Sequence, residues 1–364
     1  MSAITPSRRV RPTPFTPGVE AAGVSRYTVY NHMLLASVYE SVEADCAHLK
    51  KHVQVWDVSC ERQVSIKGPD ALRLMKLMSP RDIDRMAADQ CYYVPIVDQH
   101  GGMLNDPVAL RLDDDHFWLS LADSDTLQWA LGLAVALGLD VTIDEPDVFP
   151  LAVQGPKAEE LMARFFGDIV RDIRFFRHKR VVFEGHDFVV SRSGWSKQGG
   201  FEIFVDDSAL AMPLWDALLA KGQDLQVRAG CPNSIERIES GLLSYGLDMR
   251  RENTPYECGL GKFCNSPEPF IGHEALAREA AVGPRRRVRP LSIDGEIGPC
   301  TGVWPLYAGD ARVGQVASAV WSPDFATNVA IGMIDRGYDD TGTALRIETE
   351  HGVRTATVQE TFWN

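Results

Sequence analysis

Two stretches of the chain, "SIKGPDALRLM" at residues 65–75 and "AVQGPKAEELM" at residues 152–162, are alike in residue type and order. Each has a short apolar run, then a Gly-Pro pair, then apolar residues at helical spacing. Gly-Pro pairs mark turns, because glycine allows unusual backbone angles and proline cannot donate to a strand ladder. Each stretch therefore predicts a strand, a turn and a helix, and together they predict two similar α/β units in one chain.

The neighbouring segments predict more helices and strands of the same region. Residues 37–53 and 125–138 have apolar residues near helical spacing and predict two helices. In the first repeat, Asp70 is the predicted N-cap of the helix that follows the turn. Residues 91–112 predict a hairpin whose turn lies at Gly101-Gly102.

The character of the sequence changes from about Arg285, where short alternating runs are separated by turn residues. Such runs predict a small all-β domain. The predicted fold class is therefore α+β. An α/β region covers residues 1–280, with a second, interleaved subdomain at about 55–145, and the all-β domain covers residues 285–364.

Composition excludes several classes of protein. The chain has 364 residues, a net charge of −13 and 45% hydrophobic residues, as expected for a globular protein of two or three domains. The negative charge argues against nucleic-acid and membrane-surface binding, and no apolar run approaches the roughly 20 residues of a membrane helix. The N-terminal stretch has no apolar run of the kind a secretory signal needs. Seven scattered cysteines without a CxxC pair predict reduced thiols and a cytoplasmic protein.

Common catalytic motifs are absent from the sequence. It contains no HExxH, no GxGxxG after a strand, no phosphate-binding loop and no GxSxG motif. We therefore expect neither a metal nor a flavin. A site must then be built from side chains that come from separate segments.

Four segments combine polar and aromatic residues with nearby glycines or turns, and they supply the candidate site residues. Each has an ordinary structural interpretation: a turn aspartate before proline, a solvent-facing strand glutamate, or a helical ion pair. The candidates are Tyr30, Asn31, His32, Tyr93, Asn105, Asp106, Trp195, Lys197, Glu202 and Arg237.

Nine short motifs follow one another along the chain. They are "WDVS" (56–59), "KGPDA" (67–71), "YYVPIVDQHGGMLND" (92–106), "QGPKA" (154–158), "SGWSKQGGFEI" (193–203), "RIESGLLSYGLDM" (237–249), "ENTPYECGL" (252–260), "FIGHEAL" (270–276) and "VGQVASAVWSP" (313–323). In this order they resemble the tetrahydrofolate-dependent aminomethyltransferase family, the glycine cleavage T-protein type. The resemblance implies a three-domain cloverleaf ring with folate in its central hole and a C-terminal β-barrel or jelly-roll-like domain.

The resemblance also implies roles for four residues. Asp106 stands where the family has an aspartate beside the reactive edge of the folate, so it is the predicted catalytic residue and a folate contact. Tyr93, Glu202 and Arg237 match residues of the folate pocket. A carboxylate such as that of Glu202 suits a pterin edge, which offers a row of N–H donors.

Departures from the family pattern point to one branch of it. The family's paired aspartates appear here as Asn105-Asp106, its "DVSHM" as "DVSCE" with Cys60, and a tyrosine of its "GYTGE" motif as Trp195. These changes are similar to the dimethylsulfoniopropionate demethylase branch. That resemblance implies tetrahydrofolate as methyl acceptor and a small sulfonium as methyl donor.

The chemistry of a sulfonium suggests which residues bind it. A sulfonium has a permanent charge and no N–H or O–H, so aromatic rings are its natural partners. Trp195 is the first candidate and Tyr30 the second, with Asn31 in the same turn. Lys197 and His32 are both candidates for the substrate carboxylate, and the sequence does not choose between them.

Other functions of the family stay open as alternatives. They are the glycine cleavage aminomethyltransferase with its lipoyl carrier protein, a demethylase of another onium compound or betaine, a sarcosine-type oxidase with a flavin domain, and a folate-binding iron–sulfur assembly module. The last has a cysteine in the turn that corresponds to "GWSKQGG", where this chain has none. A homodimer is a further prediction.

Overall fold

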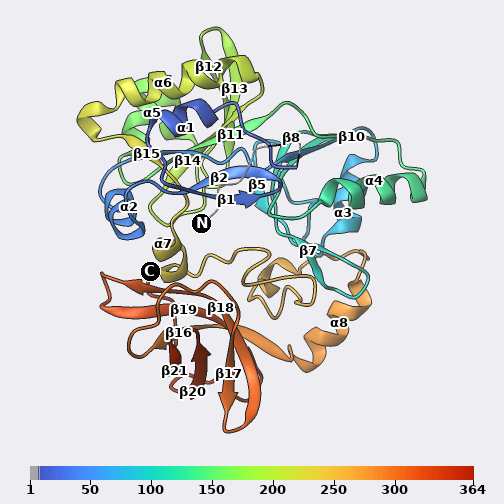
Figure 1. Ribbon diagram of the computed structural model, residues 1–364. Helices are drawn as coiled ribbons and strands as arrows, with labels where there is room; N and C mark the ends of the chain where they lie inside the picture. The colour runs from blue at the N-terminus through green and yellow to red at the C-terminus, as the bar shows by residue number, and fades with distance from the viewer. Residues whose placement is uncertain (1–6, 8) are drawn as a thin grey trace. The chain divides into compact units, whose positions relative to one another are not determined.

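The structure is a computed structural model that describes residue 7 and residues 9–364 (Figure 1). The start of the N-terminal stretch, residues 1–6 and 8, lies outside the described residues. The chain forms two compact units. The first comprises Met1–Leu74, Asp84–Tyr93 and Pro107–Asn233, and the second comprises Met75–Ile83, Val94–Asp106 and Ser234–Asn364. The predicted domain limits and the interleaved subdomain stay predictions.

A six-stranded sheet forms the centre of the first unit. Its order is β12-β13-β14-β11-β3-β15, antiparallel except between β15 and β3. The strands are β3 (Gln54–Asp57), β11 (Phe149–Gln154), β12 (His178–Phe183), β13 (His186–Ser191), β14 (Gly200–Val205) and β15 (Arg228–Gly230). Every residue of β11 after Phe149 is buried, as expected for a strand covered on both faces. Helices α5 (Ala158–Phe166) and α6 (Ala211–Lys221) add Leu161 and Trp215 to the same core.

A five-stranded antiparallel sheet completes the first unit. Its order is β10-β4-β9-β8-β5, with β4 (Gln63–Lys67), β5 (Cys91–Tyr93), β8 (Val108–Asp113), β9 (His116–Ser120) and β10 (Thr142–Asp144). Trp118 of β9 packs on Phe204 of β14 with ring centroids 6.1 Å apart, so an apolar cluster joins the two sheets. A separate hairpin pairs β1 (Arg26–Tyr30) with β2 (Met33–Val38).

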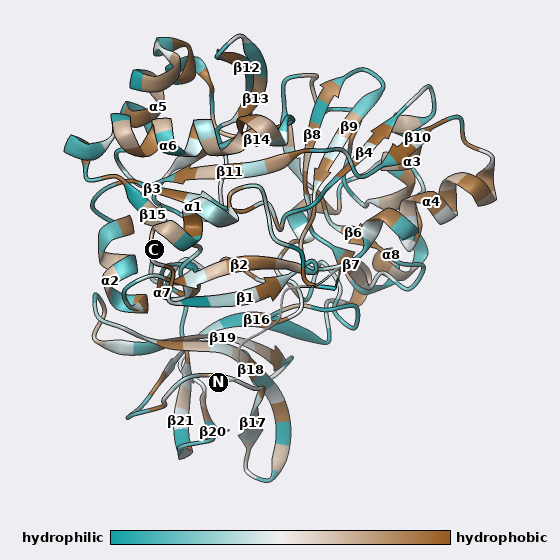
Figure 2. Cartoon of the chain, turned by 45° about the horizontal axis from the view of Figure 1, so that its top comes forward, coloured by the Kyte–Doolittle hydropathy of each residue, from teal (hydrophilic) through white to brown (hydrophobic). Residues whose placement is uncertain are grey.

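Further helices belong to the first unit. They are α1 (Thr16–Ala21), α2 (Val42–Leu49) and α4 (Thr126–Leu137), with 3-10 turns η1 (Asp168–Asp172), η2 (Ser208–Leu210) and η3 (Gln223–Leu225). Helix α4 confirms the helix predicted at 125–138 and ends at Gly138, which has a left-handed backbone. It carries no charged residue, and Figure 2 shows it as a mostly hydrophobic helix.

Both predicted strand–turn–helix units occur in the structure. The strand β4 leads into α3 (Ala71–Met78), and β11 leads into α5. Gly68 and Gly155 in the two turns have φ of +137° and +120°. A Cβ atom would lie 2.6 Å from the carbonyl oxygen of Asp140 at the first glycine and 2.3 Å from that of His52 at the second. Both turns therefore require glycine.

The helix predicted over residues 37–53 begins later than expected. Residues up to Val38 belong to β2, and the helix α2 starts at Val42. Ser41 is its N-cap, with its hydroxyl accepting a hydrogen bond from the Ala44 amide at 3.1 Å. The prediction was wrong at both ends: pairing with β1 keeps residues 37 and 38 in a strand, and α2 ends at Leu49, four residues before the predicted end.

The hairpin predicted over residues 91–112 is confirmed and is interrupted on both arms. β5 pairs with β8, while β6 (Ile96–Val97) pairs with β7 (Met103–Asn105) as a small ribbon of its own. Pro95 and Pro107 lie in the breaks. Because proline has no N–H to donate, it fits the point where a ladder is interrupted.

A closed barrel forms most of the second unit and confirms the predicted all-β C-terminal domain. Its order is β16-β19-β18-β17-β20-β21, closed by pairing of β16 with β21. The strands are β16 (Arg286–Ile293), β17 (Trp304–Ala308), β18 (Ala311–Ser322), β19 (Thr327–Asp335), β20 (Ala344–Thr349) and β21 (Gly352–Val358). Helices α7 (Ser234–Glu239) and α8 (His273–Val282) and the turn η4 (Gly261–Phe263) precede it. The predicted α+β class is confirmed.

Candidate active site

Glu202 is a buried acid in the middle of the six-stranded sheet. It lies on β14, opposite Ser191 of β13, and is 6% exposed. Ser193 donates a hydrogen bond to the Glu202 carboxylate, and the Ser191 and Ser193 hydroxyls are hydrogen-bonded to each other. Burial raises the pKa of Glu202 above its ordinary value. The sequence predicted Glu202 and missed Ser193, although a serine two residues after a strand is a plausible partner.

Tyr93 lies on a strand close to this acid. It ends β5, the strand that begins at Cys91. Burial, together with the negative charge of Glu202, raises the pKa of the Cys91 thiol, so the carboxylate is near the start of β5. Tyr93 is half-buried. The structure therefore brings β5 and Glu202 together within the first unit.

Trp195 and Lys197 lie in the connection between β13 and β14. The Trp195 side chain is half-buried and Lys197 is exposed. The Ser196 hydroxyl between them donates a hydrogen bond of 2.8 Å to the side-chain oxygen of Gln154, at the end of β11. The hydrogen bond from Ser196, which lies between the two predicted substrate-binding residues, thus attaches the connection to the sheet.

The turn between β1 and β2 carries Tyr30, Asn31 and His32. Asn31 and His32 have φ of 49° and 62°, which suits a two-residue hairpin turn and is tolerated by asparagine. The buried Asn31 amide group donates to the carbonyl oxygens of Cys60 at 3.0 Å and Ala122 at 2.9 Å. Asn31 therefore fixes the turn, while Tyr30 is half-buried and His32 is exposed. The predicted contacts of these three residues with substrate stay predictions.

Asp106 follows β7 in the second unit. Asn105 is fully buried, and its side-chain oxygen accepts a hydrogen bond from the Asp106 amide at 2.9 Å. Tyr245 donates from its hydroxyl to the carbonyl oxygen of Met103 at 3.0 Å. Burial and the nearby charge of Asp106 raise the pKa of Tyr245 to about 12. Tyr245 is thus a neighbour of the predicted catalytic residue that the sequence did not single out, although it lies in the "RIESGLLSYGLDM" motif.

Arg237 occupies a structural ion pair. Its guanidinium donates to the Asp248 carboxylate at 2.7 Å, and both side chains are at most 8% exposed. It also donates to the carbonyl oxygen of Leu242 at 3.2 Å and to the hydroxyl of Ser318 on β18. Arg237 therefore holds α7 to the following loop and to the barrel. Its predicted contact with folate stays a prediction.

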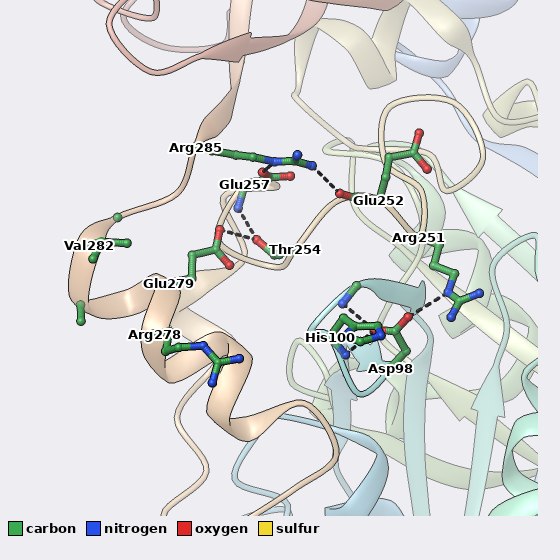
Figure 3. A pocket seen from close by; sticks show the side chains of 13 residues that line it. Asp98, His100, Arg251, Glu252, Thr254, Glu257, Arg278, Glu279, Val282 and Arg285 are labelled. Atoms are coloured by element: carbon green, nitrogen blue, oxygen red, sulfur yellow. Dashed lines mark hydrogen bonds and ion pairs between the residues drawn. The ribbon is translucent and has the colours of Figure 1, made fainter.

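A cavity of about 1030 Å³ lies in the second unit (Figure 3). Asp98 accepts a hydrogen bond from Arg251 Nε at 2.8 Å, Glu257 accepts one from Arg285 Nε at 2.7 Å, and Glu279 accepts one from the Thr254 hydroxyl at 2.8 Å. Two of the four carboxylates on its wall, those of Asp98 and Glu257, are thus paired with arginines. None of the predicted site residues is among the described residues that line it.

Two features are absent from the described part of the chain. It contains no cluster of three or more His, Cys, Asp or Glu side chains arranged to hold a metal ion. None of its helices has the length and apolar character that crossing a membrane requires.

The sequence matches two family models over nearly its whole length. Residues 16–267 match the GCVT N-terminal domain, and residues 286–363 match the glycine cleavage T-protein C-terminal barrel domain. The chain belongs to the glycine cleavage T-protein family. The family predicted from the nine motifs is therefore confirmed.

Individual relatives refine this assignment. The chain is 69% identical over 363 residues to the dimethylsulfoniopropionate demethylase of Ruegeria pomeroyi, with 100% of each chain covered. It is 30% identical to the aminomethyltransferase of Lysinibacillus sphaericus, over 89% of this chain and 90% of the other. The resemblance to the demethylase branch is thus confirmed.

A solved structure of the family has the same fold. The glycine cleavage system aminomethyltransferase T of Bartonella henselae superposes with a TM-score of 0.86, over 97% of this chain and 98% of that chain, at 23% identity. The predicted aminomethyltransferase-type fold is confirmed.

Proposed function

We propose that the protein transfers a methyl group from dimethylsulfoniopropionate to N5 of tetrahydrofolate, giving 3-(methylthio)propionate and 5-methyltetrahydrofolate. The identity of 69% over the full length of both chains to a demethylase of this substrate carries the proposal. Two of the departures from the family pattern, Asn105 and Trp195, fit the chemistry of a sulfonium.

Trp195 is proposed to hold the sulfonium, with Tyr30 as a second ring. Cation–π attraction contributes about 0.5–2 kcal/mol for each ring, depending on how far the cation is desolvated. A neutral Asn105 suits this substrate, because a second carboxylate would stabilise the positive charge that makes the methyl group electrophilic. Lys197 or His32, both exposed, would bind the substrate carboxylate.

Glu202 and Tyr93 are proposed to bind the pterin ring, and Arg237 is a further proposed folate contact. A buried carboxylate whose pKa is raised gains most from new N–H donors, because hydrogen bonds to the ionised form offset its desolvation. A pterin edge supplies such donors. The Ser193 hydroxyl already fixes the orientation of the Glu202 carboxylate.

The proposed reaction is a direct displacement. The N5 lone pair forms the new N–CH₃ bond while the S–CH₃ bond breaks, and its electron pair stays on sulfur as a neutral thioether. The leaving group therefore needs no proton. Asp106 would orient the folate and take the proton that N5 loses, and the protein would act mainly by positioning and by desolvating the sulfonium.

The glycine cleavage aminomethyltransferase is the competing function within the family. The sequence supports it less than the demethylase, because the chain is 30% identical to this aminomethyltransferase and 69% identical to the demethylase. An aminomethyltransferase of that kind would act on an aminomethylated lipoyl carrier. A demethylase of a betaine is a second competitor, because aromatic rings do not separate sulfonium from quaternary ammonium strongly.

The proposed function is tested by incubating the purified protein with tetrahydrofolate and dimethylsulfoniopropionate without oxygen. We expect 5-methyltetrahydrofolate and 3-(methylthio)propionate in equal amounts. Parallel reactions contain a betaine or an aminomethylated lipoyl carrier in place of the sulfonium. Turnover with one of those and none with the sulfonium would refute the proposed substrate and keep the family assignment.

Two further properties belong to the same proposal. All seven cysteines lie in the described part of the chain and are free thiols, which supports a cytoplasmic location. The homodimer stays a prediction, and light scattering of the purified protein would measure it.

A further inference from the structure

Gln154 is a fully buried polar residue at the end of β11, directly before the second Gly-Pro turn. Its side-chain nitrogen donates to the carbonyl oxygen of Ser193 at 3.1 Å and to that of Phe201 at 3.5 Å. Its side-chain oxygen accepts from the Ser196 hydroxyl at 2.8 Å. One amide group thus contacts the start and the middle of the connection between β13 and β14, and the beginning of β14 itself.

Two glycines beside the Gln154 amide, one in this connection and one at the start of β14, leave no room for a side chain. A Cβ atom on Gly194 would lie 2.0 Å from its nitrogen, and one on Gly200 would lie 2.5 Å from it. Gly194 also has a φ of +144°, a backbone conformation that residues with a side chain rarely adopt. Both glycines therefore let the connection close around the amide group.

We infer that Gln154 is a positioning residue for substrate binding, which holds the segment 193–200 so that Trp195 faces the sulfonium. This inference rests on the proposed function. Gln154 itself contacts backbone and the Ser196 hydroxyl, so it acts through the segment. A buried amide that satisfies two carbonyl oxygens and a hydroxyl leaves the segment little freedom, since each lost partner would expose an unsatisfied buried group.

The chain offers a matched control in Gln54. It is the strand partner of Gln154 in β3, is 1% exposed, and also fits its amide against a glycine, Gly230. Its side chain bonds the carbonyl oxygen of Asp45 at 2.9 Å and the indole nitrogen of Trp56 at 2.8 Å. The segments it holds contain none of the predicted site residues.

The test compares Gln154→Met with Gln54→Met in the full chain, since methionine keeps the length of glutamine and removes its hydrogen bonds. Steady-state kinetics give KM for dimethylsulfoniopropionate, and a titration gives the dissociation constant of tetrahydrofolate. Hydrogen exchange of peptides that cover 193–200 reports on the segment without turnover. Ser196→Ala, which removes one of the three contacts, is the milder variant if Gln154→Met does not fold.

For Gln154→Met we expect kcat/KM for the sulfonium to fall about 10–100-fold through KM, because misplaced binding groups cost that much. We also expect faster exchange in 193–200 and unchanged folate binding. Ser196→Ala should show the same pattern with a smaller change. Gln54→Met should lower stability yet keep KM within about two-fold.

Three results would contradict the inference. The first is an unchanged KM in both Gln154→Met and Ser196→Ala. The second is an equal rise of KM in Gln54→Met, which would show a general effect of weakening the sheet. The third is a wild-type protein that transfers no methyl group from the sulfonium, which would refute the proposed function itself and is recognised separately by the wild-type assay.

Discussion

The two Gly-Pro repeats, residues 65–75 and 152–162, form the same strand, turn and helix, and the residue before the glycine is one of the positions at which they differ. In the first repeat this residue is Lys67, which is exposed at the end of β4. In the second it is Gln154, which is 0% exposed at the end of β11. In both repeats the glycine has a positive φ, and a Cβ atom added to it would clash with a backbone carbonyl oxygen. The shared glycine and proline therefore form the turn in both repeats, and the residue before the glycine is the position at which we propose that the second repeat acts on substrate binding.

The surroundings of the two strands explain the difference. The end of β4 pairs with Thr142 of β10 and His116 of β9, and the Lys67 side chain is exposed. β11 lies inside its sheet, between β14 and β3, and the connection 193–200 folds over its last residue. A lysine suits the first position and a neutral amide suits the second, because a buried ammonium without a partner is costly.

The largest effect is expected when the first repeat's residue is placed in the second. Gln154→Lys would bury an ammonium among carbonyl groups and press it on Gly194, and we expect it to destabilise the protein by at least about 3 kcal/mol. Urea unfolding measures this loss. The reciprocal change, Lys67→Gln, should stay within about 0.5 kcal/mol because the side chain is exposed. Equal losses of stability in the two variants would contradict the claim that the two positions have different surroundings.

A methyl group on the segment itself should have the next largest effect. Gly194→Ala would set a Cβ 2.0 Å from the Gln154 nitrogen at a φ of +144°, at a cost of about 1–3 kcal/mol. The control is Gly132→Ala in α4, where nothing lies within 4 Å of the new Cβ. That change should stabilise the helix by about 0.5–1 kcal/mol. Thermal unfolding measures both. A Gly194→Ala variant as stable as wild type would contradict close packing of this glycine against Gln154.

Removal of the proposed aromatic contact should affect substrate binding alone. For Trp195→Ala we expect KM for the sulfonium to rise by about 2–30-fold, the equivalent of 0.5–2 kcal/mol, with nearly unchanged folate affinity. Phe175→Ala removes an aromatic ring that is 75% exposed in the same unit and should change neither. An equal loss of folate binding in Trp195→Ala would place the indole in the pterin pocket instead.

The smallest expected effect is a pH dependence caused by Glu202. Burial raises its pKa in the folded protein, so its ionised form costs stability, and that cost appears as pH rises above the ordinary value of 4.5 and through the raised pKa. The stability of Glu202→Gln relative to wild type should therefore increase with pH, while folate binding weakens. Thermal unfolding from pH 5 to pH 8 measures it. A difference that is constant or shrinks with pH would contradict the assigned cause.

Local sequence predicted much of this structure. The glycine turns, the helices after them, the hairpin and the all-β character of the C-terminal domain depend on residue types within short windows. The start of α2 was mispredicted because residues up to Val38 pair with β1. The roles of Ser193, Tyr245 and Gln154 were missed because each depends on a contact made across strands or loops. The sequence analysis included Gln154 only as the first residue of the motif "QGPKA" and predicted no contact for its side chain.

The most direct test of the proposed chemistry uses dimethylsulfoniopropionate with deuterated methyl groups. Direct displacement predicts 5-methyltetrahydrofolate whose new methyl group keeps all three deuterium atoms, with a deuterated thioether formed in equal amount. Mass spectrometry of both products after a single turnover measures this. Loss of deuterium from the transferred group, or a labelled thioether without labelled folate, would contradict a direct methyl transfer from sulfur to N5.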